Sequence, residues 1–479
     1  MNFCSFYYIV FLLFFTTLYY LFQNNKYQKI VLISASIIFL VVYNITSFLF
    51  FIGTLFLNYI GSIYLEKNKK KKVLFILIVI NISLLLVGKF SPAFQIWKAV
   101  SNRLPIPVFI APLGISFYSL ALIGYLVDIY NDKIHADRNI VDYSIFGSFF
   151  PHIVLGPIAR YSQIKSQLNG PHRFSFQQVE SGFVRIIWGF FQKLVIADRI
   201  GFFVNSVYSA DKCSGSILLI ATFLYAIQIF ADFAGCVDIA SGSAKLFGIE
   251  LTENFKVPYF SASISEFWRR WHISLSFWLR DYIYIPLGGN RKGELRKWIN
   301  IIIVFIVSGF WHGIGTGFLA WGLIHAVYQI VGSKWKPIKE KINSFLVKID
   351  SGWNSKAIDC IITFGLVDFA WIFFRTNSIR KSLSIIKKMI MNSDLSFFVD
   401  GSLYKFGLDS KSWHILFFAI IVLFIKELLC YLGYEPGRWF QKQSLFFKWI
   451  ILFIFILIII IFGIYGAGYN AANFIYAQF

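Results

Sequence analysis

The chain is poor in charge and in cysteine. Aspartate, glutamate, lysine and arginine together account for 14% of its 479 residues, whereas hydrophobic residues account for 57%. A soluble fold cannot bury so much apolar chain, so the composition excludes a water-soluble globular protein. The five cysteines are scattered and form no Cys-x-x-Cys pair. This spacing gives no zinc site and leaves the cysteines as apolar fillers.

Acidic side chains are scarcer than basic ones, 24 against 45, which gives a formal net charge of +21. Such a surplus can indicate a nucleic-acid partner, but here the basic residues stand in short clusters between apolar runs, as they do around membrane spans. We therefore expect no nucleic-acid binding. Residues 3–22 lack a basic start and a small-residue cleavage site, so we expect them to remain as the first span and not to be removed as a signal peptide.

Long apolar runs dominate the remainder. A bilayer core of ~30 Å takes about 20 helical residues to cross. The chain therefore predicts an all-α polytopic membrane protein with about 10 to 12 transmembrane helices, forming a single integral-membrane domain over residues 1–479. Residues 30–65 are too long for one crossing and divide best at Asn44, and five lysines in residues 66–72 indicate a cytoplasmic loop. The other expected spans are residues 73–90, 113–130, 184–207, 217–234, 298–311, 317–331, 358–374, 413–434 and 446–465.

Three segments depart from this pattern. Residues 146–158 are apolar but interrupted by prolines, which predicts a re-entrant or buried irregular segment. Residues 258–289 are aromatic, basic and helical in period, which predicts a helix at the membrane interface or in a protein-lined cavity. Residues 334–348 are expected to form a basic amphipathic loop.

Two histidines are the main candidates for chemistry. His312 follows Trp311 in an apolar helix, and His272 lies in the aromatic segment, one turn after Trp268. An ionisable side chain at such a depth is costly, so a functional role is the default hypothesis. A neutral imidazole can take a proton from a hydroxyl while an acyl group moves. The alternative is that each histidine is packed and hydrogen-bonded without a catalytic role.

Other kinds of site fit the sequence less well. His272, His312 and His325 have no metal-ligand spacing between them, so no metal is expected. Aspartates in apolar surroundings could serve a transporter, although pairing with lysine or arginine is the simpler explanation; they are Asp128, Asp232, Asp238 and Asp368. Basic residues in and after the aromatic segment could hold the phosphates of an acyl-CoA or could merely anchor a helix; they are Arg269, Arg270, Arg280, Arg291 and Lys292.

An ordered set of short motifs runs through most of the chain. It comprises PLGISFY at residues 112–118, FFPH at 149–152, DFAG at 232–235, ENF at 253–255, the segment 266–282, IPLGGNR at 285–291, WHG at 311–313 and WIFFR at 371–375. With this set the chain resembles the membrane-bound O-acyltransferase family. The resemblance is to its bacterial branch of alginate O-acetyltransferases, which includes peptidoglycan and cellulose acetylation proteins. The PLGGNR element separates this branch from the D-alanyl-transferring one.

The resemblance implies a ring of tilted helices around a central tunnel through a thinned membrane. It gives the catalytic role to His312 and matches His272 to a second family position, which is asparagine in many eukaryotic relatives. Candidates for lining the tunnel or binding the acyl donor are Trp268, Arg269, Trp311, Asn290 and Arg291.

The implied function is transfer of an acetyl group from cytoplasmic acetyl-CoA across the bacterial cell membrane. An extracytoplasmic SGNH-type acetyltransferase would then modify an exported polysaccharide such as alginate, peptidoglycan or cellulose. Acetyl-CoA is the expected donor, and no bound cofactor is expected. Residues 466–479 form a tail whose end resembles a Phe-x-Tyr-x-x-Phe sequence, which makes Tyr476 a candidate acyl relay. An aromatic anchor at the membrane interface is the alternative for this tail.

Two further functions stay open at this point. One is D-alanyl transfer to teichoic acid, which the related branch performs. The other is a non-enzymatic polysaccharide or lipid transporter that uses Asp128, Asp232 and Asp368.

Overall fold

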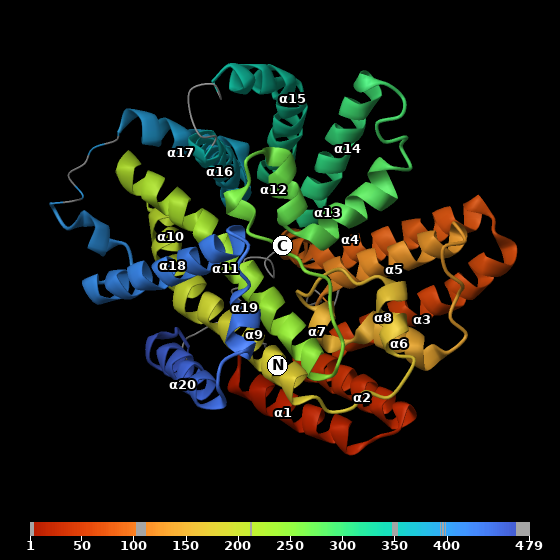
Figure 1. Cartoon of the computed structure of the whole chain (residues 1–479). Helices are drawn as coiled ribbons and strands as arrows, with labels where there is room; N and C mark the ends of the chain where they lie inside the picture. The colour runs from red at the N-terminus through yellow and green to blue at the C-terminus, as the bar shows by residue number, and fades with distance from the viewer. Residues whose placement is uncertain are drawn as a thin grey trace. The chain divides into compact units, whose positions relative to one another are not determined.

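The computed structural model of the chain describes residues 4–101, 112–210, 213–346, 353–392, 394, 397 and 399–465, with side chains described outside 90–101, 336–346 and 353–355. Every regular element within these residues is helical, as Figure 1 shows. The prediction of an all-α protein is therefore confirmed.

The helices differ widely in length. Their bounds are α1 Phe6–Leu21, α2 Asn25–Tyr43, α3 Ile45–Asn68, α4 Lys71–Ser101, α5 Ile115–Tyr130, α6 Ile140–Ser148, α7 Phe150–Ile153, α8 Tyr161–Gln167, α9 Phe176–Phe190, α10 Asp198–Ser209, α11 Gly215–Leu246, α12 Ile264–Arg270, α13 Ile273–Leu279, α14 Glu294–His312, α15 Thr316–Leu346, α16 Trp353–Thr376, α17 Ile379–Met391, α18 Ser410–Tyr431, α19 Pro436–Gln441 and α20 Leu445–Phe462. Two π-helical segments, Phe191–Ala197 and Arg280–Tyr284, follow α9 and α13.

Eight helices within the described residues are long and apolar enough to cross a membrane. They are α2, α3, α4, α11, α14, α16, α18 and α20, and the shorter apolar helices α1 and α5 have 16 residues each. The protein is thus a multi-pass membrane protein.

Two expectations about helix boundaries were wrong. Residues 258–289 do not form one helix, because the chain leaves α12 at Trp271 and restarts as α13 after His272. Residues 334–346 are not a loop but continue α15, whose helical backbone extends to Leu346. A basic amphipathic segment keeps its backbone hydrogen bonds as a helix whether or not it lies in the bilayer, so the end of the apolar run did not end the helix.

By its contacts the described chain divides into two compact units. The first holds residues up to 188 together with 236–252, and the second holds residues 189–235 and 253–465. The helices α9 and α11 contribute residues to both.

In the first unit, asparagines determine where helices end and how they pair. The Asn44 backbone N–H donates to the Leu40 carbonyl at the end of α2, while its side-chain oxygen accepts from the Ser47 N–H at 3.0 Å to begin α3. The predicted division at Asn44 is thereby confirmed.

Deeper in the unit, the buried amides of Asn58 on α3 and Asn81 on α4 donate to each other at 3.0 and 2.9 Å. Reciprocal amide bonds of this kind hold helices together where water cannot compete.

A polar cluster anchors the loop between α5 and α6 in the same unit. Asp137 accepts hydrogen bonds from the Lys165 ammonium at 2.8 Å and from the Tyr161 hydroxyl. Burial alone would raise the pKa of the Asp137 carboxyl, but the hydrogen bonds from Lys165 and Tyr161 outweigh it and lower the pKa below its usual value.

In the second unit, one buried lysine forms ion pairs with two carboxylates. The Lys193 ammonium lies 2.8 Å from the Asp198 carboxylate and 2.5 Å from that of Asp232. Lys193 occupies the π-helical segment after α9, and its side chain is buried. Asp232 is therefore paired, as the simpler explanation of the buried aspartates predicts, and in the first unit Asp128 likewise pairs with Lys133 at 3.1 Å.

The helices α14 and α15 of the second unit pack against each other more extensively than any other pair of described helices, and Figure 1 shows them side by side. Glycines make the close approach possible. A Cβ atom at Gly322 would lie 2.4 Å from the Phe305 carbonyl oxygen, and one at Gly309 would lie 2.6 Å from that of Phe318. These contacts bring the end of α14, with His312, against the first turns of α15.

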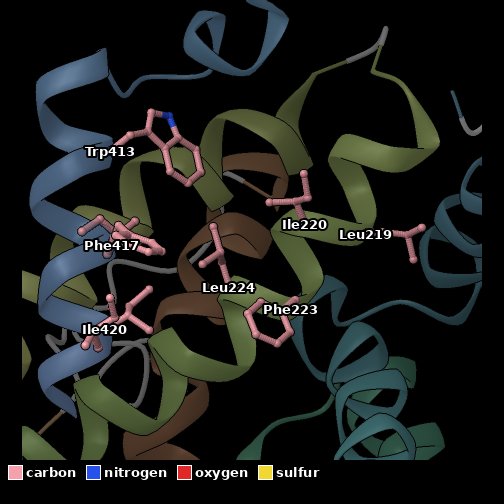
Figure 2. A pocket seen from close by; sticks show the side chains of 9 residues that line it. Leu219, Ile220, Phe223, Leu224, Trp413, Phe417 and Ile420 are labelled. Carbon is pink, nitrogen blue, oxygen red and sulfur yellow. The ribbon is translucent and has the colours of Figure 1, made fainter. Parts of the chain in front are cut away.

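The second unit also contains an open apolar pocket of about 540 Å³ between α11 and α18. Figure 2 shows its walls, among them Leu219, Phe223 and Leu224 on α11 and Trp413, Phe417 and Ile420 on α18. Its lining contains no titratable side chain, so it offers no group for acyl transfer.

Candidate active site

The turn between α12 and α13 places His272. Its backbone is left-handed, with φ +43° and ψ +54°, a conformation that costs an L-residue free energy unless the surroundings hold it. The buried Asn254 supplies that support. Its carbonyl oxygen accepts from the Ile273 N–H, and its side-chain oxygen accepts from the Ser274 N–H, both at 3.0 Å. These bonds also satisfy N–H groups that the first turn of α13 would otherwise leave without acceptors.

The His272 side chain is 1% exposed and lies among aromatic rings. Its ring centroid is 4.8 Å from that of Phe233 and 5.9 Å from that of Trp311, both in edge-on arrangements. Burial among uncharged rings disfavours an imidazolium, so a neutral imidazole is the form this setting favours.

His312 is the last residue of α14 and is 3% exposed. Its ring centroid lies 4.8 Å from that of Trp311, 5.2 Å from that of Trp321 and 5.0 Å from that of Phe374. The indole of Trp311 therefore contacts both histidines. The structure brings His272 and His312 into one aromatic cluster, although 40 residues separate them in the sequence.

The other predicted residues lie in different surroundings. Trp268 packs in the same aromatic cluster, against Trp321 at 5.7 Å between ring centroids. Arg269, Asn290 and Arg291 are exposed, a position from which they can meet a soluble ligand but not the buried rings. Tyr476 and the tail it belongs to fall outside the described residues. Among the described residues no group of three or more histidines, cysteines and carboxylates could hold a metal ion.

Two participants in the cluster were missed by sequence reasoning. His325 was considered only as a metal ligand, yet it is buried against Trp268 and Trp321, with ring centroids 5.0 and 5.1 Å apart. Asn254 was noted in a motif without a role. The spacing of Trp321 and His325, four residues apart on an apolar helix, was a signal that both face the same side.

Comparisons with known proteins agree with this picture. A model of the membrane-bound O-acyltransferase family matches residues 131–363, a range that includes all three histidines of the cluster. The peptidoglycan O-acetyltransferase of Helicobacter pylori is 32% identical over 406 residues, which cover 77% of this chain and 75% of the relative. The chain belongs to the membrane-bound O-acyltransferase family. The protein is accordingly a membrane O-acyltransferase.

Other members of the family match as well. A probable alginate O-acetylase of Pseudomonas syringae is 31% identical over 75% of this chain and 69% of its own length. The teichoic acid D-alanyltransferase of Bacillus subtilis is 28% identical over 60% of this chain and 76% of its own length.

Proposed function

We propose that the protein takes an acetyl group from cytoplasmic acetyl-CoA and passes it across the bacterial inner membrane for O-acetylation of an exported polysaccharide. The observation that carries the proposal is the pair of buried histidines that both contact Trp311, in a chain whose relatives include O-acetylating proteins. A partner enzyme of the SGNH type outside the membrane would complete the transfer to the polymer.

In this proposal His312 is the catalytic base. The neutral imidazole removes the proton of the acceptor hydroxyl as its oxygen attacks the thioester carbonyl carbon. The new C–O bond forms, the C–S bond breaks, and the proton passes to the leaving thiolate, so that an ester and free CoA thiol result. The surrounding rings of Trp321 and Phe374 exclude water, which limits loss of the acetyl group to hydrolysis.

The remaining candidates have supporting roles. His272 faces the same indole as His312 and would orient the reacting groups. Exposed Arg269 and Arg291 would bind the phosphates of CoA, and Asn290 would assist them, because guanidinium groups pair strongly with phosphate oxygens. Tyr476 would carry the acetyl group as an aryl ester, in which phenoxide is a better leaving group than an alkoxide.

Replacing His312 with alanine tests the central assignment. We expect acetylation of the exported polymer to fall by about 10²- to 10⁴-fold, the usual contribution of a general base, while membrane abundance stays unchanged. His414→Ala is the matched control, because His414 is exposed on α18 and bonds only to the Ser410 carbonyl of its own helix. Wild-type acetylation in the His312 variant would overturn the assignment.

Intact-mass analysis of the wild-type protein after incubation with acetyl-CoA reports whether Tyr476 gains an acetyl group.

The Bacillus subtilis relative supports D-alanyl transfer as a second candidate. Supplying vesicles that contain the protein with either acetyl-CoA or a D-alanyl-charged carrier protein separates the two functions. Acetyl transfer without D-alanyl transfer is the expected result.

A further inference from the structure

A third histidine, His325, packs against Trp321, and a hydrogen bond determines which of its ring nitrogens carries the proton. The Trp268 indole N–H donates to its Nδ1 atom at 3.2 Å. An indole can only donate, so Nδ1 carries no proton and the proton of the neutral ring is on Nε2. His325 is thus fixed as an Nε2–H donor.

This donor has no acceptor among the described residues. The Nε2 atom is buried, and His325 is fully enclosed, with its ring stacked parallel to those of Phe267 and Phe305. Leaving a buried N–H without an acceptor costs free energy, and such groups in native proteins require an explanation. Packing alone does not supply one, because a phenylalanine ring would fill the same stack without a polar atom.

A second donor lies one helical turn away. The ring of Trp321 contacts both His312 and His325, with centroids 5.2 and 5.1 Å away, and its buried indole N–H likewise finds no acceptor in the described part of the chain. Trp321 therefore contacts His312 directly and His325 lies one turn further along α15, and neither N–H donor has an acceptor among the described residues. The ligand that suits them is an uncharged acceptor that can enter an aromatic interior. Carbonyl oxygens of a thioester and of the amides in its pantetheine arm have this chemistry.

We infer that His325 is a substrate-binding residue whose Nε2–H, together with the Trp321 N–H, donates to a carbonyl oxygen of the acyl donor. Trp268 is then a positioning residue, which holds His325 in the donating tautomer. The inference rests on the proposed function, because that function supplies the thioester.

Substitution of His325 by phenylalanine tests it, since the ring stack is kept and only the nitrogens are lost. Vesicles containing the full chain at matched abundance are supplied with radiolabelled acetyl-CoA, and initial rates of polymer acetylation are measured over a range of concentrations. If the bound carbonyl is the reacting one, kcat falls by about 10²- to 10³-fold with little change in KM. If it belongs to an amide of the donor arm, KM rises by about tenfold at unchanged kcat. Either result supports the inference.

A double variant separates binding from simple pairing. If His325 existed only to accept the Trp268 N–H, then Trp268→Phe combined with His325→Phe would remove both partners and restore wild-type kinetics. That outcome, or wild-type kinetics in His325→Phe alone, would overturn the inference; a double variant as impaired as His325→Phe supports it. His414→Phe controls for the substitution itself. Failure of the proposed function looks different, because the wild-type protein would then transfer nothing from acetyl-CoA.

Discussion

From the close contact of α14 with α15 we predict how alanine at Gly322 and at Gly332, both on α15, changes the stability of the protein. A methyl group at Gly322 would lie 2.4 Å from the Phe305 carbonyl oxygen and 3.1 Å from the carbonyl carbon. Ordinary contacts of a Cβ atom begin near 3.4 Å. A backbone oxygen moves only with its helix, so Gly322→Ala forces α14 and α15 apart. On the same helix, Gly332 is exposed, and a Cβ atom there meets nothing within 4 Å.

The two substitutions therefore have opposite expected effects. Overpacking at Gly322 costs about 1–3 kcal/mol of stability, of which up to about 1 kcal/mol is returned by the better helix propensity of alanine. Gly332→Ala gains that propensity without the clash. Because α14 ends at His312, moving the helix also shifts the imidazole that we propose as the base, so acyl transfer should fall in Gly322→Ala and not in Gly332→Ala.

Thermal unfolding of the purified variants in one detergent, followed by tryptophan fluorescence, measures the first effect. The expected order of midpoints is Gly322→Ala below wild type and Gly332→Ala at or above it. Equal midpoints for the two variants would show that α14 and α15 are not in close contact at this glycine, and the structural reasoning would fail.

Two further predictions concern buried polar pairs. Lys193→Met removes the cation shared by the buried Asp232 carboxylate and the partly buried Asp198 carboxylate, so it should cost about 3–5 kcal/mol of stability; a thermal midpoint equal to that of the wild type would contradict the pairing. Asn58→Leu leaves the Asn81 side-chain oxygen without its donor, while the Asn81 amide nitrogen keeps its bond to the Leu77 carbonyl, and should cost about 1–3 kcal/mol. The double variant with leucine at both positions should recover most of that loss. A double variant as unstable as the single one would count against the reciprocal bonds.

The sequence was informative where a boundary is local. Asn44, within a long apolar run, predicted the division there, because its side chain and backbone bond to neighbours three and four residues away. The apolar run before Trp311 likewise predicted a helix that reaches His312.

The sequence misled where distant residues determine the backbone. The aromatic segment has a helical period throughout, but Asn254 bonds to Ile273 and Ser274 and stabilises a break at His272 that no local pattern reveals. The role of His325 was hidden for the same reason, since the indole that fixes its tautomer lies 57 residues earlier. Periodicity predicts which residues share a face but not which distant group they meet.

The left-handed backbone at His272 restricts what this position can become. Asparagine, aspartate and histidine adopt that conformation more readily than other residues with a side chain, and glycine adopts it freely. The asparagine that eukaryotic relatives are expected to carry at the matching position is one of these few. The backbone conformation therefore restricts the residue types at this position independently of any catalytic role. An alanine scan would therefore weigh the two histidines unequally. Alanine at the helical His312 removes only an imidazole, whereas alanine at His272 also puts a residue that tolerates the left-handed backbone less well at this position. Asparagine is the substitution that isolates the His272 ring.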